Sequence, residues 1–271
     1  MKYKVIALDI DGTLINTHQE IMPMTQKMLI DLQQKGIRVV LSSGRDLYSL
    51  EKIGKKLDMS QYPQSGYIAL NGLEIYDTQK NLLHKEQKLQ REDALILSRI
   101  ANQYHIDMIL FFYQKLYIQE YGHTGIIDHH FTTTKKDTNT KIQDIPIDLF
   151  KDLRKVAFVQ KKEVIQNILP LLHQEMDDSY EMTLVEADWI EINPKGLNKG
   201  NALKKYAELN NISLSEIIAF GNGENDMEML KTAGCGVAMA NSFDNVKRIA
   251  DDICGHCDED GIGKYLMDCI K

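Results

Sequence analysis

The chain has 271 residues, of which 43% are apolar and 26% are charged, a composition typical of a soluble protein with one large domain or two of about 100–150 residues. Its formal net charge of -7 argues against nucleic acid and anionic membranes as partners, because both are themselves negatively charged. The sequence has neither a basic start followed by an apolar stretch nor a long uncharged apolar run, so we expect a cytoplasmic protein without a membrane segment.

The beginning of the chain alternates between short apolar runs and apolar residues at helical spacing. The runs predict buried strands at Val5–Ile10, Ile37–Leu41 and Tyr67–Leu70. Between them, stripes around Leu29 and Leu50 predict two helices. Strands alternating with helices imply right-handed crossovers, so we expect a parallel sheet with helices on its faces.

The pattern changes in the middle of the chain. After an amphipathic helix, two adjacent short strands, Met108–Tyr113 and Leu116–Gln119, predict a hairpin. A strand at Val156–Val159, a long helix at Val164–Met176 and two further strands follow. Hairpin strands belong to antiparallel sheets, so we expect an α+β layer here.

The alternating pattern then returns. Strands are predicted at Ile217–Phe220 and Gly236–Met239, with helices around Tyr206 and Met227. The fold class is therefore α/β, with one core interrupted by an inserted domain. The predicted boundaries are 1–84 and 189–271 for the core and 85–188 for the insertion.

Polar residues stand at the carboxyl ends of the predicted core strands, where open parallel sheets bind their ligands. Ionised carboxylates beside buried chain are costly unless something pairs with them. A lysine and a divalent ion can neutralise a phosphate, while a hydroxyl and backbone N–H groups can hold its oxygens. The residues at these ends are Asp9, Asp11, Ser42, Ser43, Gly44, Lys199, Asn222, Asn225 and Asp226.

This set of side chains suits phosphoryl transfer. One carboxylate can attack phosphorus and form an aspartyl-phosphate. A second, two residues further on, can protonate the leaving alcohol and later take a proton from water. Carboxylate oxygens such as those of Asp9 and Asp226 also suit Mg²⁺.

Four segments in this order resemble the motifs of the haloacid dehalogenase-like superfamily of phosphatases. The inserted domain resembles the large α/β cap of the Cof-type branch, and Asn71-Gly72 and Asp260-Gly261 also match that branch. The resemblance spans essentially the whole chain and implies a Rossmann-like core with an α+β cap. The segments are Asp9–Leu14 (DIDGTL), Leu41–Arg45 (LSSGR), Asn198–Gly200 (NKG) and Gly221–Asp226 (GNGEND).

The resemblance implies a role for each matching residue. Asp9 is expected to be the nucleophile and a metal ligand, and Asp11 the general acid/base with its carbonyl on the metal. Ser43 is expected to hold the phosphate, with the N–H of Gly44 nearby, and Lys199 to neutralise both nucleophile and phosphate.

The remaining matches concern the metal and the substrate. Asn222 and Asp226 are expected to complete a Mg²⁺ site, with Asn225 near phosphate or metal. Arg45 could reach the substrate or pair with an acid, and Asn71 could contact the substrate or simply turn the chain. Position 222 is usually Asp in such proteins, and a neutral amide ligates without adding charge. We therefore expect either weaker metal binding or a larger contribution of Asp226 to metal binding.

Two other segments carry residues that can bind metals. Cys254-Gly255-His256-Cys257 has the C-x-x-C spacing of a redox pair or half a zinc site. Its neighbours are acidic, and the sequence has no second pair of ligands at zinc spacing, so we interpret it as an ordinary loop. Asp128-His129-His130 is interpreted as the polar face of a helix.

We therefore expect a Mg²⁺-dependent phosphomonoester hydrolase for small phosphorylated metabolites, with sugar phosphates favoured, acting as a monomer or homodimer. A phosphomutase and a catalytically weak phosphosugar-binding protein remain alternatives, the latter because of Asn222. A signalling receiver domain would use a similar set of residues, but the inserted domain and Asp11 argue against it.

Overall fold

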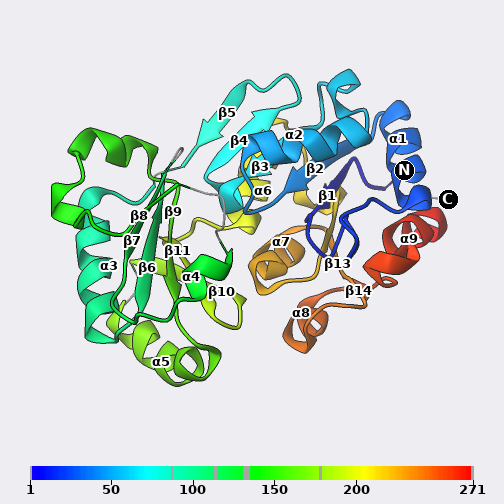
Figure 1. Cartoon of the computed structure of the whole chain (residues 1–271). Coiled ribbons are helices and arrows are strands. Elements are labelled where there is room, and N and C mark those ends of the chain that lie inside the picture. Colours follow the sequence, from blue (N-terminus) through cyan, green and yellow to red (C-terminus); the bar gives the residue numbers. More distant parts are fainter. Residues whose placement is uncertain (1, 87, 113–114, 131–134, 177–178, 270–271) are drawn as a thin grey trace. The chain divides into compact units, whose positions relative to one another are not determined.

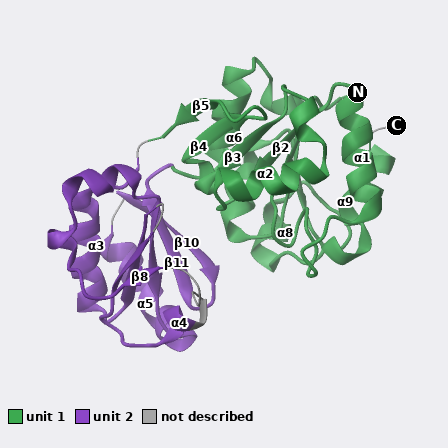
Figure 2. Cartoon of the chain, turned by 45° about the horizontal axis from the view of Figure 1, so that its top comes forward, with its two compact units in different colours: residues 1–86, 197–271 green, residues 87–196 purple. Residues whose placement is uncertain are grey.

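The computed structural model describes residues 2–86, 88–112, 115–130, 135–176 and 179–269 (Figure 1). Tyr113, at the end of a predicted strand, and the side chains of His129 and His130 lie outside this description. The chain divides into two compact units (Figure 2), which we call the core unit (Met1–Glu86 with Leu197–Lys271) and the inserted unit (Gln87–Gly196).

The core unit is built on an eight-stranded sheet in the order β14-β13-β12-β1-β2-β3-β4-β5. From β14 to β3 all neighbours are parallel, as the alternation of strands and helices predicts. The strands are β1 (Val5–Leu8), β2 (Arg38–Ser42), β3 (Gly66–Ala69), β4 (Glu74–Asp77), β5 (Leu82–Lys85), β12 (Ile217–Gly221), β13 (Cys235–Ala238) and β14 (Asp252–Ile253).

Helices cover both faces of this sheet because alternate strand residues point to opposite sides. Ile6 and Leu8 pack with α1 (Pro23–Gln34), α2 (Leu47–Lys56) and α9 (Gly261–Cys269). Val5 and Ala7 pack on the other side, against the remaining helices of the unit. These are α6 (Lys199–Leu209), α7 (Met227–Thr232) and α8 (Asp244–Ile249).

One pair of strands was not predicted. β4 and β5 extend the sheet as an antiparallel hairpin beyond β3. Leu82 and Leu83 of β5 are exposed, so the strand lacks the buried apolar run that marks the strands inside the sheet. An edge strand of this kind has a weak sequence signal.

The inserted unit is an α+β layer around a six-stranded sheet in the order β10-β11-β9-β6-β7-β8. Its pairings are antiparallel except that of β7 with β8. The sheet packs on one side against α3 (Arg91–Gln103) and α5 (Lys162–Glu175) and on the other against Ile127 of α4 (Ile126–His130). The strands are β6 (Asp107–Phe111), β7 (Leu116–Gln119), β8 (Lys136–Asp137), β9 (Lys155–Val159), β10 (Tyr180–Glu186) and β11 (Trp189–Pro194).

The last strand of the inserted unit lies beyond the boundary placed after residue 188. β11 pairs with both β10 and β9, so it belongs to the inserted sheet, and that unit ends at Gly196. Throughout the described chain, no helix combines the length and the apolar character needed to cross a bilayer.

Candidate active site

The register of the core sheet brings its polar strand ends together. Leu8, the last residue of β1, pairs with Leu41 of β2 on one side and Phe220 of β12 on the other. Asp9 follows at once, and its N–H donates to the carbonyl of Phe220 at 3.0 Å. The segments after β2 and β12 therefore flank Asp9 at the same edge of the sheet.

A buried lysine joins two of the predicted residues. Lys199 Nζ donates to Asp9 Oδ1 at 2.7 Å and to Asp226 Oδ1 at 2.6 Å. Lys199 and Asp226 are fully buried, and Asp9 is 6% exposed. The Asn198 side chain accepts the N–H of Asn201 and so caps α6, which fixes Lys199 at the first helical position.

This cluster has two acids for one base. Burial raises the pKa of Asp9 to about 7, the charge of Asp226 adds to the rise, and Lys199 opposes it. Burial by itself lowers the pKa of Lys199, but the charges of Asp226 and Asp9 outweigh it and hold that pKa above its usual value. With all three groups ionised, the cluster carries one excess negative charge, which a bound cation would neutralise.

Asp226 also organises the loop after β12. Its Oδ2 accepts the N–H groups of Asn222 and Gly223, both at 2.9 Å, while its Oδ1 faces Lys199. The two N–H groups occupy both lone pairs of Oδ2, whereas Oδ1 accepts one hydrogen bond and keeps a lone pair that a metal ion can use. Asn225 lies in the same loop with its Oδ1 folded over Gly223, where an added Cβ would be 2.6 Å away.

The Asn222 amide meets Asp9 and the main chain of Asp11 at the edge of the sheet. The outward atom of the Asn222 amide lies 2.9 Å from the main-chain oxygen of Asp11 and 3.2 Å from Asp9 Oδ2. If that atom is oxygen, three acceptors face one another; if the amide is turned over, its NH₂ donates to both neighbours. Ligand oxygens in an octahedral Mg²⁺ site are about 3 Å apart, so these residues fit the ion.

Two further residues hold the loops after β1 and β12 in place, and neither was among the site residues predicted from the sequence. The Thr13 hydroxyl lies 2.9 Å from the same atom of the Asn222 amide. Asn241 Nδ2 donates to the carbonyl of Gly12 at 2.7 Å, where Gly12 turns the chain with φ +73°. Asn241 follows β13 shortly, so the strand-end rule that selected the other residues could have found it.

The exposed carboxylate of the site is held by an arginine. Arg45 donates from Nε to Asp11 Oδ2 at 2.8 Å and from a terminal nitrogen to Oδ1 at 2.5 Å. The Asp11 side chain is 52% exposed and that of Arg45 33% exposed. Of the two roles left open for Arg45, pairing with an acid is the one present in this structure.

Ser43, Gly44 and Asn71 connect the loop after β2 with the loop after β3. Ser43 Oγ accepts the N–H of Arg45 at 3.3 Å, and the N–H of Asn71 donates to the carbonyl of Ser43 at 2.9 Å. Asn71 has φ +54° beside Leu70 at φ +53°, and a Cβ on Gly44 would lie 3.2 Å from Asn71 Nδ2. Consecutive left-handed residues store strain, as is common at binding sites.

A parallel α/β sheet whose strand ends present two acids, a lysine and a hydroxyl defines a class of phosphoryl-transfer enzymes. The family model of haloacid dehalogenase-like hydrolases matches residues 6–266. The chain belongs to this family, as the four motifs indicated. It is a Cof-type phosphatase.

Relatives match along the whole length. The 5-amino-6-(5-phospho-D-ribitylamino)uracil phosphatase YcsE of Bacillus subtilis is 32% identical over 264 residues, 97% of this chain and 94% of the relative. The pyridoxal phosphate phosphatase YbhA of Escherichia coli is 26% identical over 272 residues, 98% of each chain. A solved haloacid dehalogenase-like hydrolase from Bacteroides thetaiotaomicron superposes with a TM-score of 0.78 at 27% identity, covering 99% of this chain and 100% of that one.

Proposed function

We propose that the chain hydrolyses phosphomonoesters with Mg²⁺ through an aspartyl-phosphate on Asp9. The observation that carries this is the buried ion pair of Lys199 with Asp9 and Asp226, beside the Asn222 amide and the main-chain oxygen of Asp11. Asp9, the carbonyl of Asp11, Asn222 and Asp226 would hold the ion. When bound, Mg²⁺ supplies positive charge against the phosphate oxygens.

The side chains divide the reaction into two steps. In the first, a carboxylate oxygen of Asp9 bonds to phosphorus, the bond from phosphorus to the alcohol oxygen breaks, and protonated Asp11 gives its proton to that oxygen. In the second, Asp11 takes a proton from water, whose oxygen bonds to phosphorus as the bond to Asp9 breaks. Lys199 holds Asp9 in place throughout.

Other groups bind and orient the substrate. We expect the Ser43 hydroxyl and the N–H of Gly44 to hold phosphate oxygens, because both residues follow β2, the neighbour of the strand that ends before Asp9. For Asp11 to act as an acid its bonds to Arg45 must open, which frees the guanidinium for an anionic substrate. Asn71 and Asn225 are further candidates for contact with the substrate or phosphate.

Sugar phosphates are the first substrates to test. One relative is named for a substrate with a phosphorylated ribityl chain. The inserted unit resembles the cap of the Cof-type branch, whose loops we expect to select the substrate. Phosphate release should be measured for phosphosugars, nucleotides and cofactor phosphates, with Mg²⁺ and with a chelator. No diphosphate activator should be added, because release without one argues against a phosphomutase.

Asp9→Asn is the decisive variant. It keeps the shape of the side chain but not its nucleophilic charge, so turnover should fall by at least about 10³-fold. Asp31→Asn, on the exposed face of α1, is the control and should leave the rate unchanged. Equal rates in wild type and Asp9→Asn would refute the mechanism, and so would metal-independent turnover.

The second candidate is a phosphosugar-binding protein with weak catalysis, and Asn222 is the residue that favours it. Asn222→Asp adds a negative charge next to Asp9 and Asp11, so we predict about tenfold tighter Mg²⁺ binding by calorimetry. Wild type that binds phosphosugars without turnover, together with an Asn222→Asp variant that hydrolyses them, would support the binding function over the phosphatase function. Unchanged Mg²⁺ affinity would show that position 222 does not contact the ion.

A further inference from the structure

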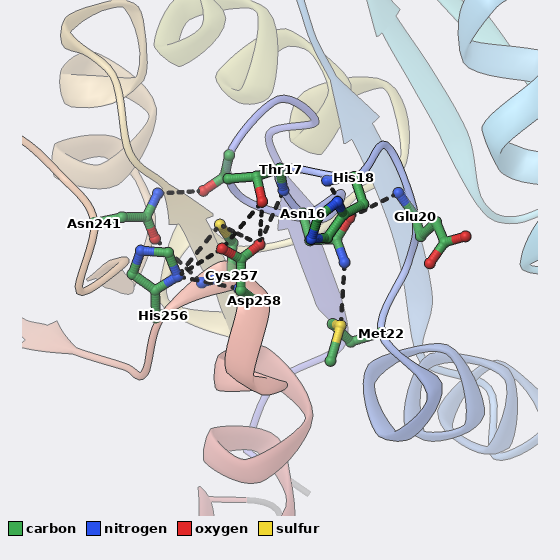
Figure 3. Close-up of polar contacts among 10 residues, drawn as sticks. Asn16, Thr17, His18, Glu20, Met22, Asn241, His256, Cys257 and Asp258 are labelled. Atoms are coloured by element: carbon green, nitrogen blue, oxygen red, sulfur yellow. Dashed lines mark hydrogen bonds and ion pairs between the residues drawn. The ribbon is translucent and has the colours of Figure 1, made fainter.

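Asn241 joins two segments that are far apart in the sequence. It follows β13, and its Nδ2 donates to the carbonyl of Gly12 at 2.7 Å, in the loop after β1. Its Oδ1 accepts the N–H of Cys257 at 3.2 Å, where a short 3₁₀ helix, Cys257–Glu259, begins. Figure 3 shows Asn241 beside the turn that contains Cys257. Both partners are main-chain groups, so the amide holds the backbone of one segment at a fixed distance from that of the other.

The orientation of this amide is determined by its partners. The NH₂ group faces a carbonyl, which can only accept, and the amide oxygen faces an N–H, which can only donate. Turning the amide over would place like groups against each other at both ends. Asn241 is therefore a donor toward Gly12, and no side chain that only accepts can replace it there.

The carbonyl that Asn241 holds belongs to the turn that directs the Asp11 carbonyl. Gly12 has φ +73°, and because glycine can adopt many conformations, this turn needs contacts that select one of them. The N–H of Gly12 donates to the carbonyl of Ile15 at 3.1 Å. This bond anchors the peptide group between Asp11 and Gly12, and Asn241 anchors the next peptide group. Together the two contacts fix the rotations about Gly12, and with them the direction of the Asp11 carbonyl beside Asn222.

We propose that Asn241 is a positioning residue for the Mg²⁺ site, which acts through the backbone of Gly12 and not as a ligand. This inference rests on the proposed function, in which the Asp11 carbonyl is one of the ligands. Mg²⁺ demands near-ideal octahedral geometry, so a carbonyl that can swing away is a poor ligand. Groups that orient metal ligands without touching the metal typically raise the affinity by about 10–100-fold.

A second contact between the same two segments provides a matched control. Asp258 accepts the N–H and the hydroxyl of Thr17 at 2.9 and 3.0 Å (Figure 3). Thr17 lies beyond Ile15, whose N–H donates to the carbonyl of Ile10 at 2.9 Å. The chain is therefore anchored ahead of Thr17, and loss of its hydroxyl should not reach Gly12.

The test is Mg²⁺ binding by the full-length protein, measured by calorimetry without substrate. Asn241→Leu keeps the size of the side chain and removes both hydrogen bonds, so it should weaken Mg²⁺ binding by at least about tenfold. Asn241→Ser is a milder change, because it leaves room for water, and should weaken binding by at least about threefold. Thr17→Val should change the affinity by less than about twofold. Circular dichroism checks folding, and Asn241→Ser keeps the test valid if Asn241→Leu does not fold.

A kinetic measurement separates positioning from a general loss of structure. In Asn241→Ser, the Mg²⁺ concentration for half-maximal phosphate release should rise by at least about threefold, while kcat at saturating Mg²⁺ falls by less than about twofold. Equal Mg²⁺ affinity in wild type and the folded Asn241 variants would overturn this inference and leave the proposed function standing. So would a Thr17→Val variant that binds as weakly as Asn241→Leu. Wild type that binds no Mg²⁺ would overturn both.

Discussion

Lys199 is the residue that joins the two buried carboxylates of the candidate active site. It lies between Asp9 and Asp226 without exposure to solvent, so each charge is stable only through the others. Removing one partner from a buried ion pair leaves an uncompensated charge and costs about 3–5 kcal/mol. The same contacts that position Asp9, the proposed nucleophile, therefore contribute to stability.

Replacing Lys199 tests this at the residue scale. Lys199→Met should lower the free energy of unfolding by about 3–5 kcal/mol at neutral pH, measured by urea denaturation. Lys204→Met, at an exposed position of the same helix, is the matched control and should change it by less than about 0.5 kcal/mol. Equal stability of the two variants would mean that the buried charges do not depend on Lys199.

The raised pKa of Asp9 predicts a pH dependence of stability. Since the folded state binds the Asp9 proton more tightly than the unfolded chain does, the contribution of this group is fully present below about pH 4. It is then lost as the pH rises to about 7, by at most about 1.4 kcal/mol per pH unit. The measurement is the unfolding free energy of wild type minus that of Asp9→Asn, with chelator present. A difference that rises with pH over this range would contradict the prediction.

At the scale of elements, α1 takes its N-terminal cap from the other end of the chain. Met22 at its start makes no side-chain cap, and Pro23 has no N–H to satisfy. Asp260 instead accepts the N–H groups of Thr25 at 2.8 Å and Met24 at 3.3 Å. This gives Asp260, which matches the Cof-type branch, a structural reason to be acidic.

Removing this cap should destabilise the core unit. We predict that Asp260→Ala lowers the free energy of unfolding by about 1–2 kcal/mol, because two N–H groups lose their acceptor. Asp260→Asn keeps an acceptor oxygen and tolerates φ +58°, so it should retain most of the stability. An alanine variant as stable as the asparagine variant would show that solvent replaces the carboxylate without cost.

The elements themselves were largely predictable, whereas their side-chain partners were not. Buried runs such as Val5–Ile10 and Ile217–Phe220 identify the strands inside the sheet because apolar side chains cover both faces. β5 was missed because its edge position leaves it exposed. Strand ends located Asp9 and Asn222, but the pairing of Arg45 with Asp11 depends on how far a long side chain reaches across neighbouring loops.

At the scale of the molecule, the core sheet depends on residues from both ends of the chain. β1 pairs with β12, so Val5 meets Ile217 across the whole inserted unit. The sheet of the inserted unit, by contrast, is formed entirely from strands between Asp107 and Pro194. Its contacts therefore close shorter loops, and loop closure carries an entropic cost that grows with length.

This arrangement has a consequence for the order of folding. On the ribosome, β1 emerges early but lacks its neighbour β12 until more than two hundred residues later, at Ile217. The interior of the inserted unit can gain protection from hydrogen exchange first. Pulse labelling during refolding should show amides of β6 and β9 protected before those of β1 and β12. The opposite order would mean that the core closes across an unfolded insertion. Until the core closes, Asp9 lacks its partner Lys199.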